Sequence, residues 1–338
     1  PALRRFAESV REGVLAAVTA AELDDRVEVE VYDDAGDAAR AGALLDEIEG
    51  TEVFGIVGPL QDDALDAAAV ARSGEAPIVS PTAFAVPGVE GVYSLGNLDP
   101  QSARELAAWA ASVGIRTVAM VHAADPASLE EAEVFRAAFE GAGGAVVRTL
   151  TYPPGQTFFQ EQILAVAAAR PEALVFPVAP SDVEALAPQV TFYGLDTLGI
   201  QVLGTAAWTD EGVREAVSAR HLSGVVVASP DLTDRSGYDR FVDAYETRFR
   251  RTYLQDPGAE FGYDAASLLL EAARRGARSP SQMAERLEEV EEFAGATGLL
   301  SVESGRLLRR HRVVCYEGAD PVPIRPGRPL QRWRAYPM

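Results

Sequence analysis

The residues that most often carry out reactions are few in this sequence and lie far apart. The chain has one cysteine, Cys315, and three histidines, His122, His221 and His311. His311 and Cys315 are four residues apart, so on a strand their side chains would share one face. A buried strand cysteine of this kind usually packs as a small apolar residue. We therefore expect no cysteine–histidine catalytic pair, no internal disulfide and no cysteine-rich metal site.

Other signatures of catalysis are missing as well. The sequence contains no lysine, which excludes a P-loop lysine, a Schiff-base lysine and a lysine-paired kinase site. It also has no Gly-x-Ser-x-Gly and no His-Glu-x-x-His motif. Neighbouring carboxylates such as Asp24-Asp25 and Asp33-Asp34 fall near strand ends and turns, which is typical of solvated caps. The sequence thus predicts a protein that is not an enzyme and has no cofactor.

The composition indicates an acidic protein that is large enough for sizeable cores. Of 338 residues, 48% are hydrophobic, and 30 basic against 51 acidic side chains give a net charge of −21. Such a charge argues against general binding to nucleic acid or to anionic membranes. No uncharged apolar stretch reaches the length of a membrane span, and no segment has the pattern of a signal peptide. At about 150 residues per domain, the length suggests two domains.

Short β-rich runs alternate with helical patterns along the chain, including helices expected at 3–21, 261–275 and 281–292. Several of the runs are continuously apolar, as in parallel strands covered on both faces. The alternation predicts an α/β fold with parallel sheets and right-handed crossovers. The expected strands are residues 27–32, 53–57, 77–79, 117–122, 145–152, 173–178, 201–205 and 224–229, followed by short strands up to Ile324.

Several helix starts carry capping patterns. Ser128, Ser181 and Ser279 are each followed three residues later by Glu or Gln, which matches the capping box. Asp99 before Pro100 has the pattern of an N-cap with proline at the first helical position.

In open parallel sheets, ligands bind beyond the carboxyl ends of the strands. This rule selects the loops at 58–63, 80–84, 122–128, 179–182, 205–210 and 229–233. Several of these loops also have a structural interpretation. Asp62 or Asp63 fits a helix N-cap, and Ser80 and Thr82 fit a turn. Trp208 either stacks on a ligand or packs between domains. The candidate ligand-binding residues are Asp62, Ser80, Thr82, Ala83, Phe84, Asp125 and Trp208.

A family resemblance emerges from motifs in a fixed order. They are Val31-Tyr-Asp-Asp-Ala-Gly-Asp37, Val53-Phe-Gly-Ile-Val-Gly-Pro59, Ala76-Pro-Ile-Val-Ser-Pro81, Tyr152-Pro-Pro-Gly155, Gly262-Tyr-Asp-Ala265 and Gly295-Ala-Thr-Gly298. This order resembles the type I periplasmic solute-binding proteins of the leucine/isoleucine/valine-binding group. The segment Leu203-Gly-Thr-Ala-Ala-Trp208 is also similar to the penicillin-binding-protein activator branch.

The resemblance implies two Rossmann-like lobes joined by three hinge crossings. Lobe one would comprise residues 1–121 and 256–305, and lobe two residues 122–255 and 306–338. Members of the family open with a strand, whereas this sequence opens with the helix at 3–21, so the first strand is expected to be missing from this chain. A segment upstream would be able to supply it.

The amino-acid pocket of the family is not retained in our alignment. The pocket serine falls at Asp62, the threonine of the Ser-Pro motif at Phe84, and the acidic partner of the ligand ammonium at Ala206. Two tyrosines of the second lobe fall near Ala127 and Pro180. A zwitterion needs donors for its carboxylate and a charge or acceptors for its ammonium, so we expect a ligand other than a free α-amino acid.

Two functions follow from the resemblance. The first is a non-enzymatic, extracytoplasmic solute-binding protein that closes on a small molecule between its lobes and delivers it to an ABC transporter permease. The alternative is an interaction module of the cell envelope on the same fold, similar to the penicillin-binding-protein activators, with an envelope protein as its partner. Titration with a solute library and recovery of envelope partners discriminate the two.

Overall fold

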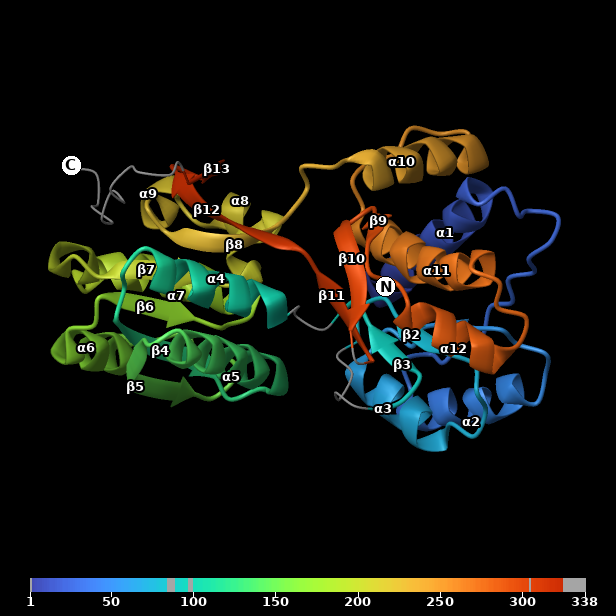
Figure 1. Ribbon diagram of the computed structural model, residues 1–338, viewed down its shortest axis with the longest axis horizontal. Coiled ribbons are helices and arrows are strands. Elements are labelled where there is room, and N and C mark those ends of the chain that lie inside the picture. The colour runs from blue at the N-terminus through green and yellow to red at the C-terminus, as the bar shows by residue number, and fades with distance from the viewer. Residues whose placement is uncertain (1, 84–88, 97–99, 304, 325–338) are drawn as a thin grey trace. The chain divides into compact units, whose positions relative to one another are not determined.

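The computed structural model describes residues 2–83, 89–96, 100–303 and 305–324, and within it the chain divides into two compact units. Unit 1 comprises Pro1–Leu98 and Asp231–Arg310, and unit 2 comprises Asp99–Pro230 and His311–Met338. The chain therefore passes between the units three times (Figure 1).

The first two passages lie earlier in the chain than the predicted positions near Val121 and Asp256, and the third lies close to the predicted Arg306. The reason for the first difference is the helix α4 (Pro100–Ser112), which packs in unit 2 on the strands β8 (Val226–Pro230) and β12 (His311–Glu317). The reason for the second difference is the helix α10 (Ser236–Phe249), which packs in unit 1 on the helix α1 (Ala2–Ala20).

Unit 2 is built on one seven-stranded sheet with the order β13-β12-β8-β7-β6-β4-β5. Strands β4 to β8 run parallel, and β12 and β13 add antiparallel at one edge. The parallel strands are continuously buried in β6 and β7, as the apolar runs predict. The strands are β4 Thr117–Ala123, β5 Ala145–Tyr152, β6 Ala173–Phe176, β7 Gln201–Gly204, β8 Val226–Pro230, β12 His311–Glu317 and β13 Asp320–Pro323.

Helices cover both faces of this sheet, and each face has its own apolar cluster (Figure 1). One cluster contains residues of α4 and α5, and the other contains residues of α6, α7, α8 and α9. The helices are α5 Pro126–Gly141, α6 Gln160–Ala169, α7 Pro180–Phe192, α8 Glu211–Ala216 and α9 Ala219–Leu222, with short 3-10 turns η1 Leu195–Leu198 and η2 Ala206–Thr209.

Unit 1 contains fewer residues in strands than unit 2. Its parallel sheet contains three short strands in the order β1-β2-β3, and a separate antiparallel sheet has the order β11-β10-β9. The strands are β1 Ile56–Val57, β2 Ile78–Ser80, β3 Val92–Ser94, β9 Phe293–Gly295, β10 Gly298–Glu303 and β11 Arg306–Arg309. The helices are α1 Ala2–Ala20, α2 Ala38–Glu49, α3 Asp62–Ala71, α10, α11 Pro257–Arg274 and α12 Pro280–Glu288.

The predicted strand at 27–32 is wrong as secondary structure, because these residues form no ladder with any described strand. The predicted strand at 53–57 is reduced to β1. The three long helices predicted in this unit are confirmed as α1, α11 and α12.

Two of the motifs that carry the family resemblance meet in unit 1. Asp264 of α11 is fully buried and accepts hydrogen bonds from the backbone N–H of Ala296 (2.5 Å) and of Thr297 (2.9 Å). The Thr297 hydroxyl donates a third bond of 2.6 Å. A Cβ on Gly295 would lie 2.6 Å from the Asp264 carboxylate, which explains the glycine. The carboxylate thus fixes the β9–β10 turn to α11.

The capping patterns have mixed outcomes. Ser279 is the N-cap of α12 and accepts from Gln282 N–H, as predicted. Ser128 and Ser181 are not N-caps: Asp125 caps α5, and Ala179 precedes α7 with no side-chain cap. In both cases a proline occupies the start of the helix and moves it upstream of the serine. Asp99 lies outside the described residues.

Candidate functional site

Three of the predicted binding residues in unit 1, Ser80, Thr82 and Ala83, lie at or just after the carboxyl end of β2. Ser80, the last residue of β2, is buried, and its hydroxyl donates to the Pro59 carbonyl (2.6 Å) and accepts from Ala83 N–H (2.9 Å). The Thr82 hydroxyl donates to the Leu60 carbonyl (2.9 Å). These bonds tie the loop after β2 to the loop after β1.

This geometry gives the two hydroxyls a positioning role. Each hydroxyl has one proton to donate, and in Ser80 and Thr82 that proton goes to a protein carbonyl. Ala83 is buried and contributes its backbone N–H to the same loop. The predicted contact at Phe84 lies outside the described residues.

Asp62 is exposed at the first position of α3, and Asp63 follows it in the same turn. Gln61 is the N-cap residue, so the interpretation of Asp62 or Asp63 as the N-cap is wrong. Carboxylates in a first turn are favourable there because the helix dipole is positive at that end. They also neutralise the part of the helix that would otherwise attract an anionic ligand.

In unit 2, Asp125 lies directly after β4 and caps α5, accepting from Ser128 N–H at 2.9 Å. Its side chain is half-buried. Two further residues at this edge were not among the candidate ligand-binding residues. They are Tyr152, the last residue of β5, and Asp182 in α7, which ends the predicted loop 179–182. The Tyr152 hydroxyl donates to Asp182 Oδ2 at 2.7 Å. Burial and the Asp182 carboxylate both raise the pKa of Tyr152, so the phenol stays a donor.

Glu131 of α5 is a second residue that the sequence did not reveal. It is fully buried, and its Oε1 accepts from the Ser102 hydroxyl of α4 at 3.1 Å. Burial raises its pKa to about 7, although hydrogen bonds from Thr205 and Ser102 act in the opposite direction. The sequence pattern at Glu131 was misleading, because its spacing of three residues from Ser128 indicated the carboxylate partner of a capping box.

Trp208 is buried in unit 2, with 1% of its surface exposed. Its ring packs on Phe176 with centroids 5.7 Å apart, and its carbonyl accepts from the Tyr316 hydroxyl at 2.7 Å. Both partners belong to unit 2. In this structure Trp208 therefore packs inside one unit, which differs from both the stacking position and the interdomain position considered above.

The structure brings Asp62, Ser80, Thr82 and Ala83 together in unit 1, and it brings Asp125 and the Trp208 segment to the strand ends of unit 2. All of these positions follow the ends of parallel strands, where the topology rule expects a ligand. No group of three or more histidine, cysteine or acidic side chains within the described part of the chain is arranged to hold a metal ion.

Two Rossmann-like units linked by three passages of the chain are typical of two-lobed binding proteins. A comparison with protein families supports this assignment of the fold. The periplasmic binding protein model matches residues 3–314. The chain therefore belongs to the periplasmic binding protein family.

Solved structures share the fold. The ABC transporter substrate-binding protein from Sphaerobacter thermophilus is 20% identical, with a TM-score of 0.72 and coverage of 97% of this chain and 94% of that one. The leucine-binding protein LivK from Thermotoga maritima is 21% identical, with a TM-score of 0.70 and coverage of 94% and 92%. A Rhodopseudomonas palustris solute-binding protein in complex with 3,4-dihydroxybenzoic acid is 21% identical, with a TM-score of 0.67 and coverage of 93% and 90%. No curated protein matches the sequence.

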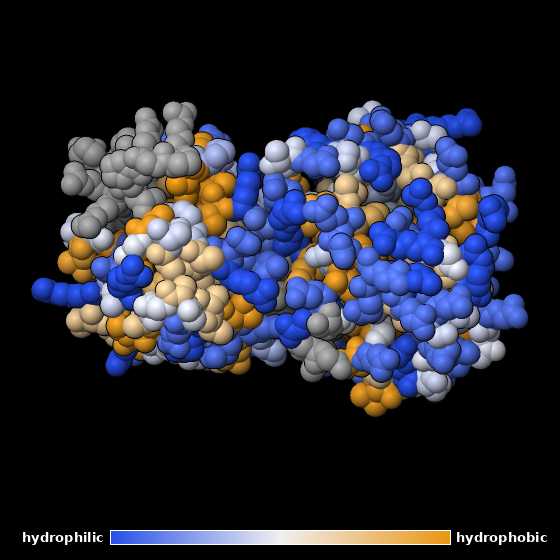
Figure 2. All heavy atoms as spheres, viewed as in Figure 1, coloured by the Kyte–Doolittle hydropathy of each residue, from blue (hydrophilic) through white to orange (hydrophobic). Residues whose placement is uncertain are grey.

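Polar side chains cover most of the face seen in Figure 2, in keeping with the net charge of −21. Within the described residues, every helix is too short or too polar to cross a bilayer.

Proposed function

We propose that this chain is a non-enzymatic substrate receptor of an ABC transporter that works outside the cytoplasm and presents a small solute to a permease. The observation that carries this proposal is the family match over residues 3–314. The similar structures are substrate-binding proteins, one of them named for leucine and one solved with a hydroxylated benzoate. We further propose that loops after the parallel strands of both units supply the ligand contacts.

The ligand of this proposal is a small organic cation. A carboxylate ligand needs hydrogen-bond donors, and the Ser80 and Thr82 hydroxyls already donate to protein carbonyls. The first turn of α3 carries two carboxylates, Asp62 and Asp63, which repel an anion. In unit 2, Asp125 and Asp182 follow β4 and β6. A negative edge of this kind favours cations.

A thermal-shift panel tests the ligand class. Choline and putrescine represent organic cations, and leucine, isoleucine and benzoate represent solutes that the names of similar structures give. A bound solute raises the melting temperature in proportion to RT ln(1 + [L]/Kd). We expect a rise with at least one cation and none with leucine or benzoate. A rise with leucine or benzoate alone would overturn the ligand class but leave the receptor function standing.

Native mass spectrometry tests the receptor function itself. The protein is measured as purified and again after mild unfolding, and a molecule released on unfolding gives the mass of the solute. An empty protein that also gives no shift with a broad solute library would contradict the proposal.

Asp125 provides the first variant. Asp125→Asn keeps the N-cap, because Asn caps about as well as Asp, but removes the charge at the ligand edge. We expect about tenfold weaker binding of a cationic solute by calorimetry, since hydrogen bonds to charged groups contribute about 1.5–3 kcal/mol. Glu140→Gln is the matched control, because Glu140 is exposed near the other end of the same helix. Equal affinities of the two variants would exclude Asp125 from the site.

A further inference from the structure

The two edges of the seven-stranded sheet in unit 2 differ in their capacity to pair with another strand. The edge strand β13 is four residues long, and two of them, Pro321 and Pro323, have no N–H to donate. The opposite edge strand, β5, has eight residues and no proline. It pairs with β4 and with no other strand of the described part of the chain (Figure 1). Because unpaired N–H and C=O groups are a template for a further strand, β5 is the edge to which another chain can add.

The hydrogen bonds toward β4 show which backbone groups of β5 are open. The Tyr152 carbonyl accepts from the N–H of Ala124, just after β4, at 2.8 Å. Successive residues of a strand direct their backbone groups to opposite sides, so Thr151 and Thr149 direct theirs away from the sheet. The register with β4 is irregular near the start of β5. Residues 148–152 are therefore the regular part of the open edge.

Exposed apolar side chains lie on the elements at this edge. Val147 of β5 is 45% exposed, Leu129 of α5 is 44% exposed and Leu164 of α6 is 48% exposed. Phe158, which precedes α6, is 62% exposed. Both helices contact β5. Exposed apolar side chains around an open backbone edge are typical of a surface that binds another protein.

Helix α5 presents opposite charges at the same edge. The Arg136 guanidinium donates to the Thr149 hydroxyl of β5 at 2.9 Å, and it lies 3.5 Å from the Glu133 carboxylate. The Glu133 side chain is 72% exposed and the Arg136 side chain 29% exposed. Leu129 precedes Arg136 by seven residues, and residues at this spacing lie on one face of a helix. The face of α5 toward the open edge thus carries one acid, one base and one exposed leucine.

We propose that the open edge of β5 is a homodimer interface, in which β5 pairs with β5 of a second copy about a two-fold axis at Leu150. A two-fold axis perpendicular to the sheet makes this pairing antiparallel. It places Thr149 opposite Thr151 of the second copy, and both direct their backbone groups toward the partner strand. Leu150 lies opposite Leu150 of the second copy, and Arg148 lies opposite Tyr152. No charged residue of the strand then faces a like charge, which would be unfavourable directly across two strands.

A second copy is the occupant that the charges favour. Arg136 binds Thr149, which is next to the axis at Leu150. The axis keeps α5 of both copies on one side of the extended sheet, in antiparallel orientation, so Glu133 of one copy faces Arg136 of the other. These contacts are self-complementary, as a two-fold interface requires. The net charge of −21 on each copy opposes association at long range, but salt at 0.15 M screens charges over about 8 Å.

Sedimentation velocity of the purified chain tests the proposal at 0.15 M salt. The paired stretch is short, so we expect a weak dimer, with a Kd on the order of 10 µM. Between roughly 1 µM and roughly 200 µM, the sedimentation coefficient should rise from that of a monomer to that of a dimer. A monomer throughout this range would overturn the proposal. A series of larger oligomers would overturn it as well, because a two-fold interface closes at two copies.

Thr151 provides a matched pair of variants. Thr151→Pro removes a backbone N–H that points away from β4, whereas Thr151→Ala removes only the side chain and keeps that donor. We expect at least tenfold weaker dimerisation for Thr151→Pro, and a change of less than about threefold for Thr151→Ala, because the bonds between the strands remain. Thermal melts verify that both variants are folded. Equal dimerisation of the two variants contradicts strand pairing.

A charge exchange on α5 tests the partner without proline. Glu133→Arg leaves two arginines beside the axis in each copy, and Arg136→Glu leaves two glutamates. Each variant alone should dimerise at least tenfold more weakly than the parent chain. An equal mixture restores opposite charges on both sides of the axis, so we expect it to form a heterodimer with about the affinity of the parent dimer. A mixture that stays monomeric would overturn the axis at Leu150, and so would undiminished dimers of either variant alone.

Discussion

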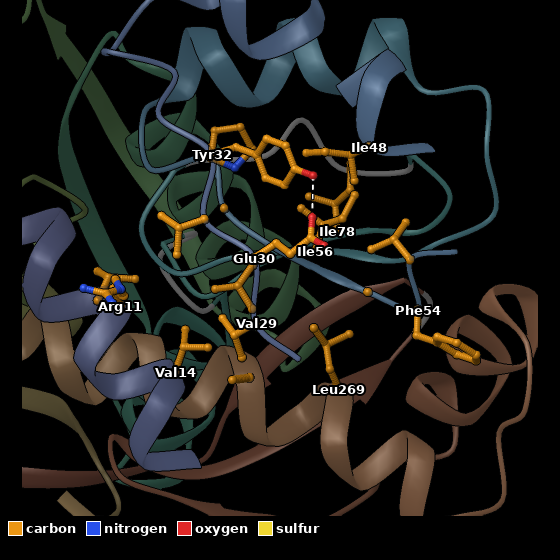
Figure 3. A pocket seen from close by; sticks show the side chains of 18 of the residues that line it. Arg11, Val14, Val29, Glu30, Tyr32, Ile48, Phe54, Ile56, Ile78 and Leu269 are labelled. Carbon is orange, nitrogen blue, oxygen red and sulfur yellow. Dashed lines mark hydrogen bonds between the residues drawn. The ribbon is translucent and has the colours of Figure 1, made fainter. Parts of the chain in front are cut away.

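The two units use the same alternation of strands and helices but complete it to different degrees. In unit 2 seven strands form one sheet whose apolar clusters lie on both faces. In unit 1 the parallel sheet has three strands of two or three residues each, and a hollow of about 1610 Å³ lies beside it (Figure 3).

The difference shows in the aromatic side chains. Phe176 in β6 is fully buried, and Trp208 packs on it. Phe54, just before β1, lines the hollow and is 50% exposed. Because apolar burial is the dominant favourable contribution to folding, we expect the sheet of unit 2 to be considerably more stable than that of unit 1.

The largest expected effect comes from truncating these two residues in the same way. Phe176→Ala leaves a cavity in the core of unit 2 and should lower the free energy of unfolding by about 3–5 kcal/mol. Phe54→Ala removes a half-exposed ring and should lower it by about 0.5 kcal/mol. Urea unfolding followed by tryptophan fluorescence reports unit 2, where Trp109 and Trp208 lie. Hydrogen exchange of α11 reports unit 1.

Equal effects of the two substitutions would contradict the expectation that the sheet of unit 2 is more stable than that of unit 1. A larger cost for Phe54→Ala would mean that the apolar wall of the hollow is covered in solution.

A smaller effect is expected from the buried carboxyl group in unit 2. Burial raises the pKa of Glu131 to about 7, whereas the ordinary value is about 4.3 in the unfolded chain. The folded state thus holds the proton between these values, and stability is highest below about pH 4.3 and falls as the pH rises to about 7. For this one group the loss amounts to about 3–4 kcal/mol, at about 1.4 kcal/mol for each unit of pKa difference.

Glu131→Gln tests this pH dependence, because glutamine keeps the shape and still bonds Ser102 without a charge. We expect the variant to gain stability over the parent chain between pH 5 and pH 8, measured by urea unfolding at each pH. Glu140→Gln, at an exposed position of the same helix, should leave the pH profile unchanged. A parallel profile for Glu131→Gln and the parent would show that the carboxyl has an ordinary pKa.

The sequence predicts the fold of unit 2 better than that of unit 1, for a physical reason. Strand β5 occurs at the predicted residues 145–152, and β4, β6, β7 and β8 lie within a few residues of their predicted bounds. These strands have partners on the sheet, so local pattern and tertiary pairing agree. Residues 27–32 have as clear a pattern but no described partner, and a strand exists only where its backbone groups are paired.

The candidate site was predictable by position but not by role. Parallel topology places Ser80, Asp125 and the Trp208 segment at strand ends, as expected. The pattern does not reveal that Ser80 bonds to Pro59 or that Trp208 packs on Phe176. Glu131 and Asp182 were missed because each is defined by a partner on another element, Ser102 and Tyr152.

The smallest expected effect compares two serines with the same sequence pattern. Ser279 in unit 1 and Ser181 in unit 2 each precede Gln or Glu by three residues, but only Ser279 accepts a hydrogen bond from the helix backbone. Ser279→Ala should therefore lower the free energy of unfolding by about 1 kcal/mol. Ser181→Ala should change it by less than about 0.5 kcal/mol. Urea midpoints of the two variants measure the difference, and a loss for Ser181→Ala as large as that for Ser279→Ala would show that α7 is capped by its serine after all.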